Sequence, residues 1–356
     1  MKYPFKKLYF VWFRFGGGAT MGCYQPWLAC KDLDIPAEVL SQSEFFSRIN
    51  TIRDSAFFIM KERINQGIVN TLRNNNNVVV RYAGDGIESA EVSYFKNIRN
   101  LSGVIVGSNE FKRIVDSSCL DTYSCVIPAN HDLFLSDTMF KKERDREFSL
   151  YFGGSRSTDG YLIQGDLGLK PEMNFSEGYF HSLRYVEKNM KSFPSSEVQS
   201  YVSNIAATGK CETLEALKLS NENPARHSCH YAVRAPFARH STSDRYNNYD
   251  QWNTKTGGKV STAAASGANI ITSLDPSVRV LIDDNYPYSI DTTTSSFRDN
   301  HDKVCQDMLE KARSTFGTRV WQEGLEMLSL VKERTKTHNI VREYVSFINN
   351  LYEVGH

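Results

Sequence analysis

The sequence predicts an α/β protein of two tandem domains, each built on a mostly parallel sheet. Three observations support this fold class. Short apolar runs alternate with helical stretches over roughly the first 135 residues, and the alternation resumes after a charged run at 141–147. Glycine-rich turns follow the first apolar run and the run at 148–152. The length of 356 residues exceeds that of one typical domain.

The first domain is predicted from a regular alternation of strands and helices. Short apolar runs bounded by turn residues predict strands at 7–13, 37–41, 56–60, 78–82, 103–107 and 123–128. Longer amphipathic stretches predict helices at 21–33, 62–74, 88–100 and 108–117. Because parallel strands are joined by crossover helices, this order predicts a sheet covered on both faces. We assign residues 1–140 to a Rossmann-like N-terminal domain.

The second domain is expected to repeat this plan after the charged run, which is interpreted as a solvated linker. A strand at 148–152 and a strand at 227–233 are predicted, with further elements at 178–189, 196–205 and 214–219. Two amphipathic helices are expected at 301–333 and 338–352. We assign residues 141–335 to a second Rossmann-like domain, and residues 336–356 to a helix that returns to the first domain.

The stretch 255–273, KTGGKVSTAAASGANIITS, carries the strongest chemical signal. It reads as a loop, a short helix that begins near Gly257 and Gly258, a stop at Gly267 and a strand. The first turn of such a helix offers unpaired N–H groups and the positive end of its dipole, which suit an anion. Lys255 and Lys259 are four residues apart, so both would reach one diphosphate. The alternative is an ordinary helix–strand unit with solvated lysines.

Composition excludes several classes of protein. A net charge of +1 argues against a dedicated nucleic-acid binder. Seven cysteines without a CxxC pair suggest neither a disulfide framework nor a zinc ribbon, so a reducing cytoplasm fits best. His227 and His230 are three residues apart, but apart from Cys229 no cysteine or carboxylate set accompanies them, so neither metal nor cofactor is expected. No apolar run is long enough to span a bilayer. The start, KYPFKKLYFVWFR, is interpreted either as a peripheral membrane contact or, preferably, as the first buried strand.

Four segments, in order, resemble GT-B glycosyltransferases. LSGVIVGSNEFKRIV and CVIPANHD resemble first-domain segments of that family, and YFGGSRS resembles the strand that opens its second domain. KTGGKVSTAAASGANIITSLDPS resembles the pattern K-P-x-x-K-hhxAhxxGhPhI of transferases that assemble polysaccharides. The resemblance implies two domains that face a central cleft, with a nucleotide-sugar donor on the second and a glycan or other hydroxyl acceptor on the first.

The resemblance also implies a set of site residues. A diphosphate leaving group must be stabilised, and without metal this requires helix N–H groups, Lys and Arg. The expected donor-binding residues are Gly153, Gly154, Ser155, Arg156, Arg234, Lys255, Gly257, Gly258, Lys259, Ser261, Thr262, Tyr286 and Tyr288. A turn at Gly16, Gly17 and Gly18 would approach the diphosphate or the acceptor from the first domain.

The sequence departs from retaining members of the family at two positions. Many of these carry two glutamates eight positions apart, where this chain has Thr254 and Thr262. Inverting chemistry is therefore slightly favoured, and it needs a general base. Asp85, which follows the strand at 78–82 between two glycines, is the first candidate. His131, with Asp132 beside it, is the alternative.

Other functions remain open on the sequence alone. A nucleotide-sugar epimerase can share the two-domain architecture, and interconversion of sugar epimers without acceptor would identify it. A non-catalytic nucleotide-binding scaffold would bind nucleotide without turnover. A dinucleotide oxidoreductase is disfavoured because the first glycine turn, GGGxxMG, does not match GxGxxG.

Overall fold

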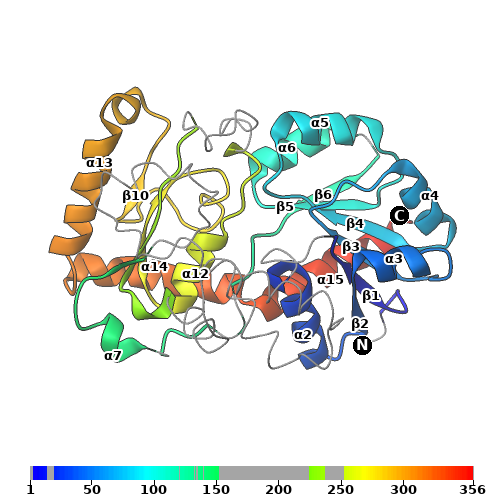
Figure 1. The fold of residues 1–356 in the computed structure, drawn as a ribbon, viewed down its shortest axis with the longest axis horizontal. Coiled ribbons are helices and arrows are strands. Elements are labelled where there is room, and N and C mark those ends of the chain that lie inside the picture. Colours follow the sequence, from blue (N-terminus) through cyan, green and yellow to red (C-terminus); the bar gives the residue numbers. More distant parts are fainter. Residues whose placement is uncertain are drawn as a thin grey trace, which may run out of the picture.

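The computed structural model describes residues 3–13, 20–119, 121–131, 133, 135–138, 140–151, 224–236 and 252–355. They form two parallel sheets flanked by helices, one sheet in each lobe of the molecule (Figure 1). This confirms the predicted α/β class with two Rossmann-like units. The predicted elements at 178–189, 196–205 and 214–219 lie outside the described residues.

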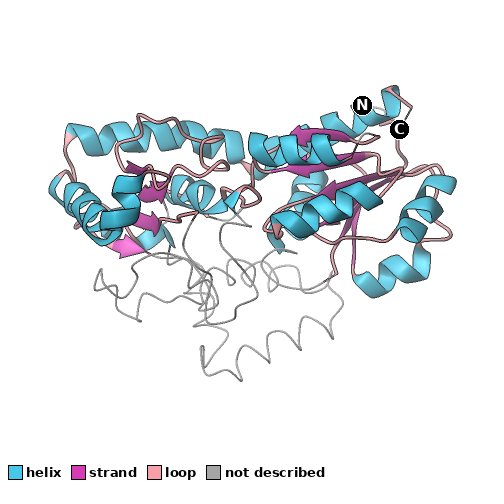
Figure 2. Cartoon of the chain, turned by 90° about the horizontal axis from the view of Figure 1, so that it is seen from above, coloured by secondary structure: helices cyan, strands magenta, loops and turns pink. Residues whose placement is uncertain are grey.

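The first sheet has six parallel strands in the order β2-β1-β3-β4-β5-β6. The strands are β1 (Leu8–Val11), β2 (Ala37–Leu40), β3 (Ala56–Met60), β4 (Val78–Tyr82), β5 (Gly103–Val106) and β6 (Tyr123–Val126). The central strands are buried almost throughout, because helices lie on both faces of the sheet (Figure 2). β1 is fully buried, so the aromatic start of the chain forms core, as preferred from the sequence.

The connecting helices follow the predicted alternation, with one addition. They are η1 (Thr20–Tyr24, a π-helical turn), α2 (Gln25–Asp32), α3 (Gln42–Arg48), α4 (Gln66–Asn74), α5 (Glu88–Asn97) and α6 (Asn109–Ser118). α3 was not expected from the sequence. Its start is fixed by a capping box, in which the Ser41 hydroxyl accepts from the Glu44 N–H and the Glu44 carboxylate accepts from the Ser41 N–H.

The second sheet has four parallel strands in the order β10-β9-β8-β7. They are β7 (Leu150–Tyr151), β8 (Cys229–Ala232), β9 (Asn269–Ser273) and the unexpected β10 (Ser289–Ile290). Helix α12 (Gly258–Ser266) precedes β9, and Gly267 ends it in the left-handed conformation, with φ of 67°. The loop, helix, glycine stop and strand predicted for 255–273 are therefore all present.

Three helices, rather than the two expected, close the chain. They are α13 (Ser295–Ser314), α14 (Arg319–Thr335) and α15 (Thr337–Glu353). Gly317, with φ of 75°, lies in the turn between α13 and α14 and separates them. α15 passes beneath the first sheet (Figure 1), where Tyr344 packs against Phe58 with ring centroids 4.8 Å apart and the rings tilted by 42°. The C-terminal helix thus completes the core of the first domain.

The charged run at 141–147 is not simply a solvated linker, and this expectation is corrected. Part of it forms the short helix α7 (Lys141–Arg144). Arg144 is 6% exposed, and its guanidinium donates to the carbonyl oxygens of Ser266 and Asp137. Because Ser266 is the last residue of α12, a cation meets the negative end of that helix.

Candidate functional site

The amino end of α12 has no side-chain cap, as the glycine pair in the sequence predicts. Its N-cap, Gly257, provides no side-chain cap. A Cβ at Gly257 would lie 2.7 Å from a methyl of Leu281 and 3.1 Å from the Ser277 carbonyl, so this glycine is required for packing. A Cβ at Gly258 would meet only the Ala129 side chain, at 3.8 Å. Gly258 therefore leaves space in front of the first helical turn.

This end of α12 lies against the carboxyl edge of the first sheet. The Ser261 hydroxyl donates to the Ala129 carbonyl, beyond β6, at 2.9 Å. In the preceding loop, the Thr254 carbonyl accepts from the Asp85 N–H at 2.8 Å. The Ser108 hydroxyl, after β5, donates to the carbonyl of Asn253 at 2.9 Å. The loop and the first turn of α12 thus lie where the two domains meet.

Two expected cations lie at this edge, and one of them has an unusual pKa. Arg234 follows β8, and its Nη1 lies 3.1 Å from the Asp275 carboxylate, while its Nη2 donates to the Thr256 carbonyl at 3.3 Å. Lys259 lies in the first turn of α12. Burial, assisted by the positive charge of Arg234, lowers the pKa of the Lys259 ammonium to about 7. An anion bound here would restore the charge of that lysine.

Asp275 is a structural residue that the sequence reading missed. It is 1% exposed, and one carboxylate oxygen accepts from the Ser277 N–H at 3.1 Å, the Ser277 hydroxyl at 2.6 Å and the Val278 N–H at 3.0 Å. Its other oxygen pairs with Arg234. The Asp-Pro-Ser sequence is a turn signal that could have identified it. Asp275 thereby orients the guanidinium of Arg234.

The candidate base Asp85 lies between two lysines. Its carboxylate is 2.5 Å from Nζ of Lys61 and 3.9 Å from Nζ of Lys255, and its side chain is 32% exposed. Burial would raise the pKa of Asp85, but the charges of Lys61 and Lys255 outweigh it and hold that pKa well below its usual range. Lys61 is not among the residues expected from the sequence, because no local sequence pattern links it to Asp85.

The alternative base, His131, lies at the connection between the domains. It is 6% exposed. Its backbone N–H donates to the Thr335 carbonyl at 3.0 Å, and its carbonyl accepts from the Thr337 hydroxyl at 2.7 Å. These bonds join the chain that leaves the first domain to the junction of α14 and α15. Asp132 lies outside the described residues.

Three further predicted residues have partners inside the second domain. Tyr286 is 2% exposed and donates to the Asn269 side chain at 3.1 Å, and Tyr288 is fully buried against the hydroxyl of Thr315. Both tyrosines are core residues here, because the loop before β10 folds over the sheet, and we leave them out of the proposed site. The Thr262 hydroxyl donates to the Gly258 carbonyl at 2.9 Å, within α12.

Several predicted positions cannot be placed. The turn at Gly16, Gly17 and Gly18 and the segment Gly153, Gly154, Ser155 and Arg156 lie outside the described residues. Within the described part of the chain, no group of three or more His, Cys, Asp and Glu residues could hold a metal ion. No helix among those residues has the length and apolar character needed to cross a bilayer.

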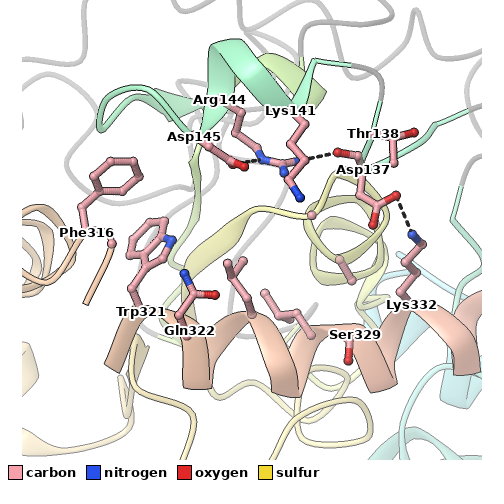
Figure 3. A pocket seen from close by; sticks show the side chains of 15 residues that line it. Asp137, Thr138, Lys141, Arg144, Asp145, Phe316, Trp321, Gln322, Ser329 and Lys332 are labelled. Carbon is pink, nitrogen blue, oxygen red and sulfur yellow. Dashed lines mark hydrogen bonds and ion pairs between the residues drawn. The ribbon is translucent and has the colours of Figure 1, made fainter. Parts of the chain in front are cut away.

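A separate pocket of about 410 Å³ lies at the opposite end of α12, between residues 137–145 and α14 (Figure 3). Its charged side chains are largely paired, with Lys332 2.9 Å from Asp137 and Arg144 3.0 Å from Asp145. Phe316 and Trp321 form one wall. The described lining contains none of the predicted site residues, so this pocket is distinct from the amino end of α12.

Comparisons with known proteins identify the fold. No protein-family model matches the chain, and no curated protein matches it. The structure of HepE from Anabaena, in complex with UDP and glucose, has a TM-score of 0.52 at 11% identity, over 97% of this chain and 99% of that one. A glycosyltransferase from Rickettsia africae gives 0.57 at 11%, over 99% and 100%.

Sucrose-phosphate synthase from Thermosynechococcus elongatus gives a TM-score of 0.57 at 8% identity, over 98% of this chain and 100% of that one. At such identities the likeness is one of fold, and it extends over nearly the whole chain. The protein therefore has the two-domain GT-B fold of glycosyltransferases.

Proposed function

We propose that the protein is a glycosyltransferase that moves a sugar from a nucleotide-sugar donor to a glycan or another hydroxyl acceptor. The observation that carries the proposal is the amino end of α12, which has no side-chain cap and holds Lys259 beside Arg234 at the interdomain edge. Two cations and the uncapped first turn of a helix would form a site for a diphosphate. The similar fold of HepE, solved with UDP and glucose, supports a nucleotide sugar as the ligand.

The proposed site would stabilise the leaving diphosphate without a metal ion. Negative charge grows on the diphosphate as its bond to the sugar breaks, and fixed donors that face this charge lower the barrier. The Lys259 ammonium and the backbone N–H of Gly258 would face the phosphates directly. Arg234 is paired with Asp275, which would hold its guanidinium in a defined orientation toward the phosphates. Lys255 would complete the set from the preceding loop.

Asp85 is the proposed general base, and inversion at the sugar is the favoured outcome. Its side chain is a third exposed at the carboxyl edge of the first sheet, whereas His131 is 6% exposed within the interdomain connection. Thr254 and Thr262 stand where retaining relatives carry glutamates, and their hydroxyls bond to backbone carbonyls. A carboxylate on the first domain would then take the proton of the acceptor hydroxyl.

A panel of UDP-, GDP- and CDP-sugars tests this function. We expect one donor to raise the thermal midpoint, because a ligand that binds only the folded state stabilises it. The same donor should be hydrolysed slowly without acceptor, in the presence of a chelator. Neither a thermal shift nor hydrolysis with any donor would overturn the proposal.

A further inference from the structure

Lys61 and Asp85 face each other across two neighbouring strands. Lys61 follows β3 and Asp85 follows β4, which are parallel and place Met60 opposite Tyr82. Both residues have left-handed backbones, with φ of 60° and 56°. This conformation is unfavourable for residues with a Cβ and persists where the surroundings fix it. The structure thus forces the ammonium and the carboxylate to within 2.5 Å.

The backbone of Lys61 is fixed by a buried arginine. Arg81, on β4, is 1% exposed, and its guanidinium donates to the Lys61 carbonyl at 3.1 Å and to the Glu62 carbonyl at 2.9 Å. The same guanidinium is bidentate to the buried Glu91. The Lys61 N–H donates to the Tyr82 carbonyl at 2.9 Å. These bonds therefore fix the backbone from which the Lys61 side chain reaches Asp85.

Lys255 reaches the same carboxylate from the second domain. Its Nζ is 3.9 Å from the second carboxylate oxygen of Asp85, which is longer than the Lys61 contact. Two hydrogen bonds to backbone carbonyls join the residues that follow β4 to the loop before α12. The Asp85 N–H donates to the Thr254 carbonyl, and the Thr254 hydroxyl donates to the carbonyl of Gly86. Asp85 thus has a fixed partner in its own domain and a looser partner across the boundary.

Four ionisable groups act on this carboxylate. Lys61, Lys255 and Arg234 favour its charged form, and the buried hydroxyl of Tyr82 lies near it. With both lysines in place the pKa of Asp85 stays well below its usual range, which makes the carboxylate a weak base. Loss of one lysine partner would raise that pKa and strengthen the base.

We infer that Lys61 is a positioning residue for Asp85, and that Asp85 and the donor's diphosphate compete for Lys255. This inference rests on the proposed function. In the free protein Lys255 pairs with Asp85. A bound donor would draw Lys255 to its phosphates, which carry more negative charge than one carboxylate. Lys61 would then be the close ion-pair partner left to Asp85, in the domain that is proposed to bind the acceptor.

The transfer step follows from this exchange of partners. The acceptor hydroxyl gives its proton to the Asp85 carboxylate, and its oxygen forms a bond to the anomeric carbon. The bond between that carbon and the diphosphate oxygen breaks, and its electron pair leaves with the nucleoside diphosphate. Because the base gains strength only after donor binding, the acceptor hydroxyl should lose its proton only when donor is bound.

A double-mutant cycle tests the competition. Donor affinity is measured by titration calorimetry without acceptor in wild type, Asp85→Asn, Lys255→Met and the double variant. Asparagine tolerates the left-handed conformation, so Asp85→Asn should fold. We expect it to bind donor roughly 5-fold tighter, within the usual range for coupled sites. In the Lys255→Met background the gain should be much smaller, because only the weaker effect of Asp85 on Arg234 and on the diphosphate itself remains. Equal or weaker binding by Asp85→Asn would overturn the inference.

The positioning role is tested by kcat and its pH profile. Lys61→Met should lower kcat and move the acid limb of its pH profile to higher pH, because Asp85 loses its nearer cation. Lys61→Arg keeps the charge and should recover part of kcat. A purely structural role would lower kcat without moving the acid limb, and that result would overturn the assignment.

A matched control lies at the amino ends of the strands of the same sheet. Asp54, with φ of 54°, pairs with Lys6 at 2.7 Å. Asp54→Asn removes the same kind of ion pair and should change neither donor affinity nor kcat. If wild type binds no donor, the proposed function itself fails. If wild type binds donor and Asp85→Asn behaves like Asp54→Asn, only the competition fails.

Discussion

Ser261 and Ala129 join the two domains through one hydrogen bond, in which the Ser261 hydroxyl donates to the Ala129 carbonyl at 2.9 Å. Ser261 lies in the first turn of α12 and is fully buried. Ala129 belongs to the segment that leaves the first domain. The amino end of α12 is thereby fixed relative to the first sheet.

Removing this bond should affect both stability and ligand binding. We expect Ser261→Ala to cost about 1 kcal/mol in the free energy of unfolding, the usual value for one hydrogen bond. Donor affinity should also fall, because α12 loses a bond that fixes its position against the first domain. Ser266→Ala is the control, since that hydroxyl donates to the Thr262 carbonyl within α12 at 2.8 Å. Equal losses of donor affinity in both variants would contradict this account.

Donor binding should weaken as the pH rises. In the free protein the pKa of Lys259 is about 7, lowered by burial and by Arg234, so the ammonium is charged below that pH and neutral above it. A bound diphosphate favours the charged form and raises this pKa. Affinity should therefore be greatest below pH 7 and fall by up to about ten-fold per pH unit above it. Calorimetry with a nucleotide sugar, whose diphosphate does not titrate in this range, measures the effect.

Lys259→Arg provides the control for this pH dependence. Arginine stays charged throughout the range, so its donor affinity should be nearly flat between pH 6 and 9. Wild-type binding near pH 8 should also take up protons, which is seen as a dependence of the binding enthalpy on the buffer. A flat wild-type profile would show that Lys259 does not contact the phosphates.

The end of α12 at Gly267 should be sensitive to any side chain. Gly267 has φ of 67°, and a Cβ there would lie 2.7 Å from Cβ of Asp137 and 2.8 Å from the Arg144 guanidinium. We expect Gly267→Ala to cost about 2–3 kcal/mol of unfolding free energy, from backbone strain and crowding together. At Gly317 φ is 75° and a Cβ meets nothing within 4 Å, so Gly317→Ala should cost only about 1 kcal/mol. Similar costs at both sites would show that Arg144 does not crowd this end.

The buried pair Arg81 and Glu91 should be strongly coupled. The Arg81 and Glu91 side chains are 1% and 2% exposed, and Nη1 and Nη2 of Arg81 both donate to the Glu91 carboxylate. Arg81→Met should cost about 3–5 kcal/mol, because it leaves Glu91 buried with Arg63 as the one remaining ion-pair partner among the described residues. The double variant with Glu91→Leu should lose less than the sum of the single losses. Additive losses in chemical denaturation would argue against the coupling.

Much of the fold could be predicted because its signals are local. The strand at 56–60 is a continuous apolar run between Ser55 and Lys61, and the strand at 78–82 is apolar and aromatic except for Arg81. The structure has both at those bounds. Helix α3 was missed because it has only seven residues, although Ser41 and Glu44 carry the spacing of a capping box. The split between α13 and α14 was missed for a similar reason, since only Gly317 marks it.

The site depends on relations that a single chain does not display. Lys61 meets Asp85 because β3 and β4 pair in one register, and no local pattern records that register. Tyr286 and Tyr288 lie in a polar sequence, DDNYPYS, yet they are buried because their loop folds over the second sheet. Within the charged run at 141–147, only the position of the α12 carboxyl end decides that Arg144 is buried.

The most direct test of the central claim is a crystal soaked with a mixture of UDP, GDP and CDP in the presence of a chelator. We expect one nucleotide between the two domains, with its diphosphate against the backbone N–H of Gly258 and the side chains of Lys259 and Arg234. A diphosphate bound elsewhere, or bound only when metal is supplied, would contradict it.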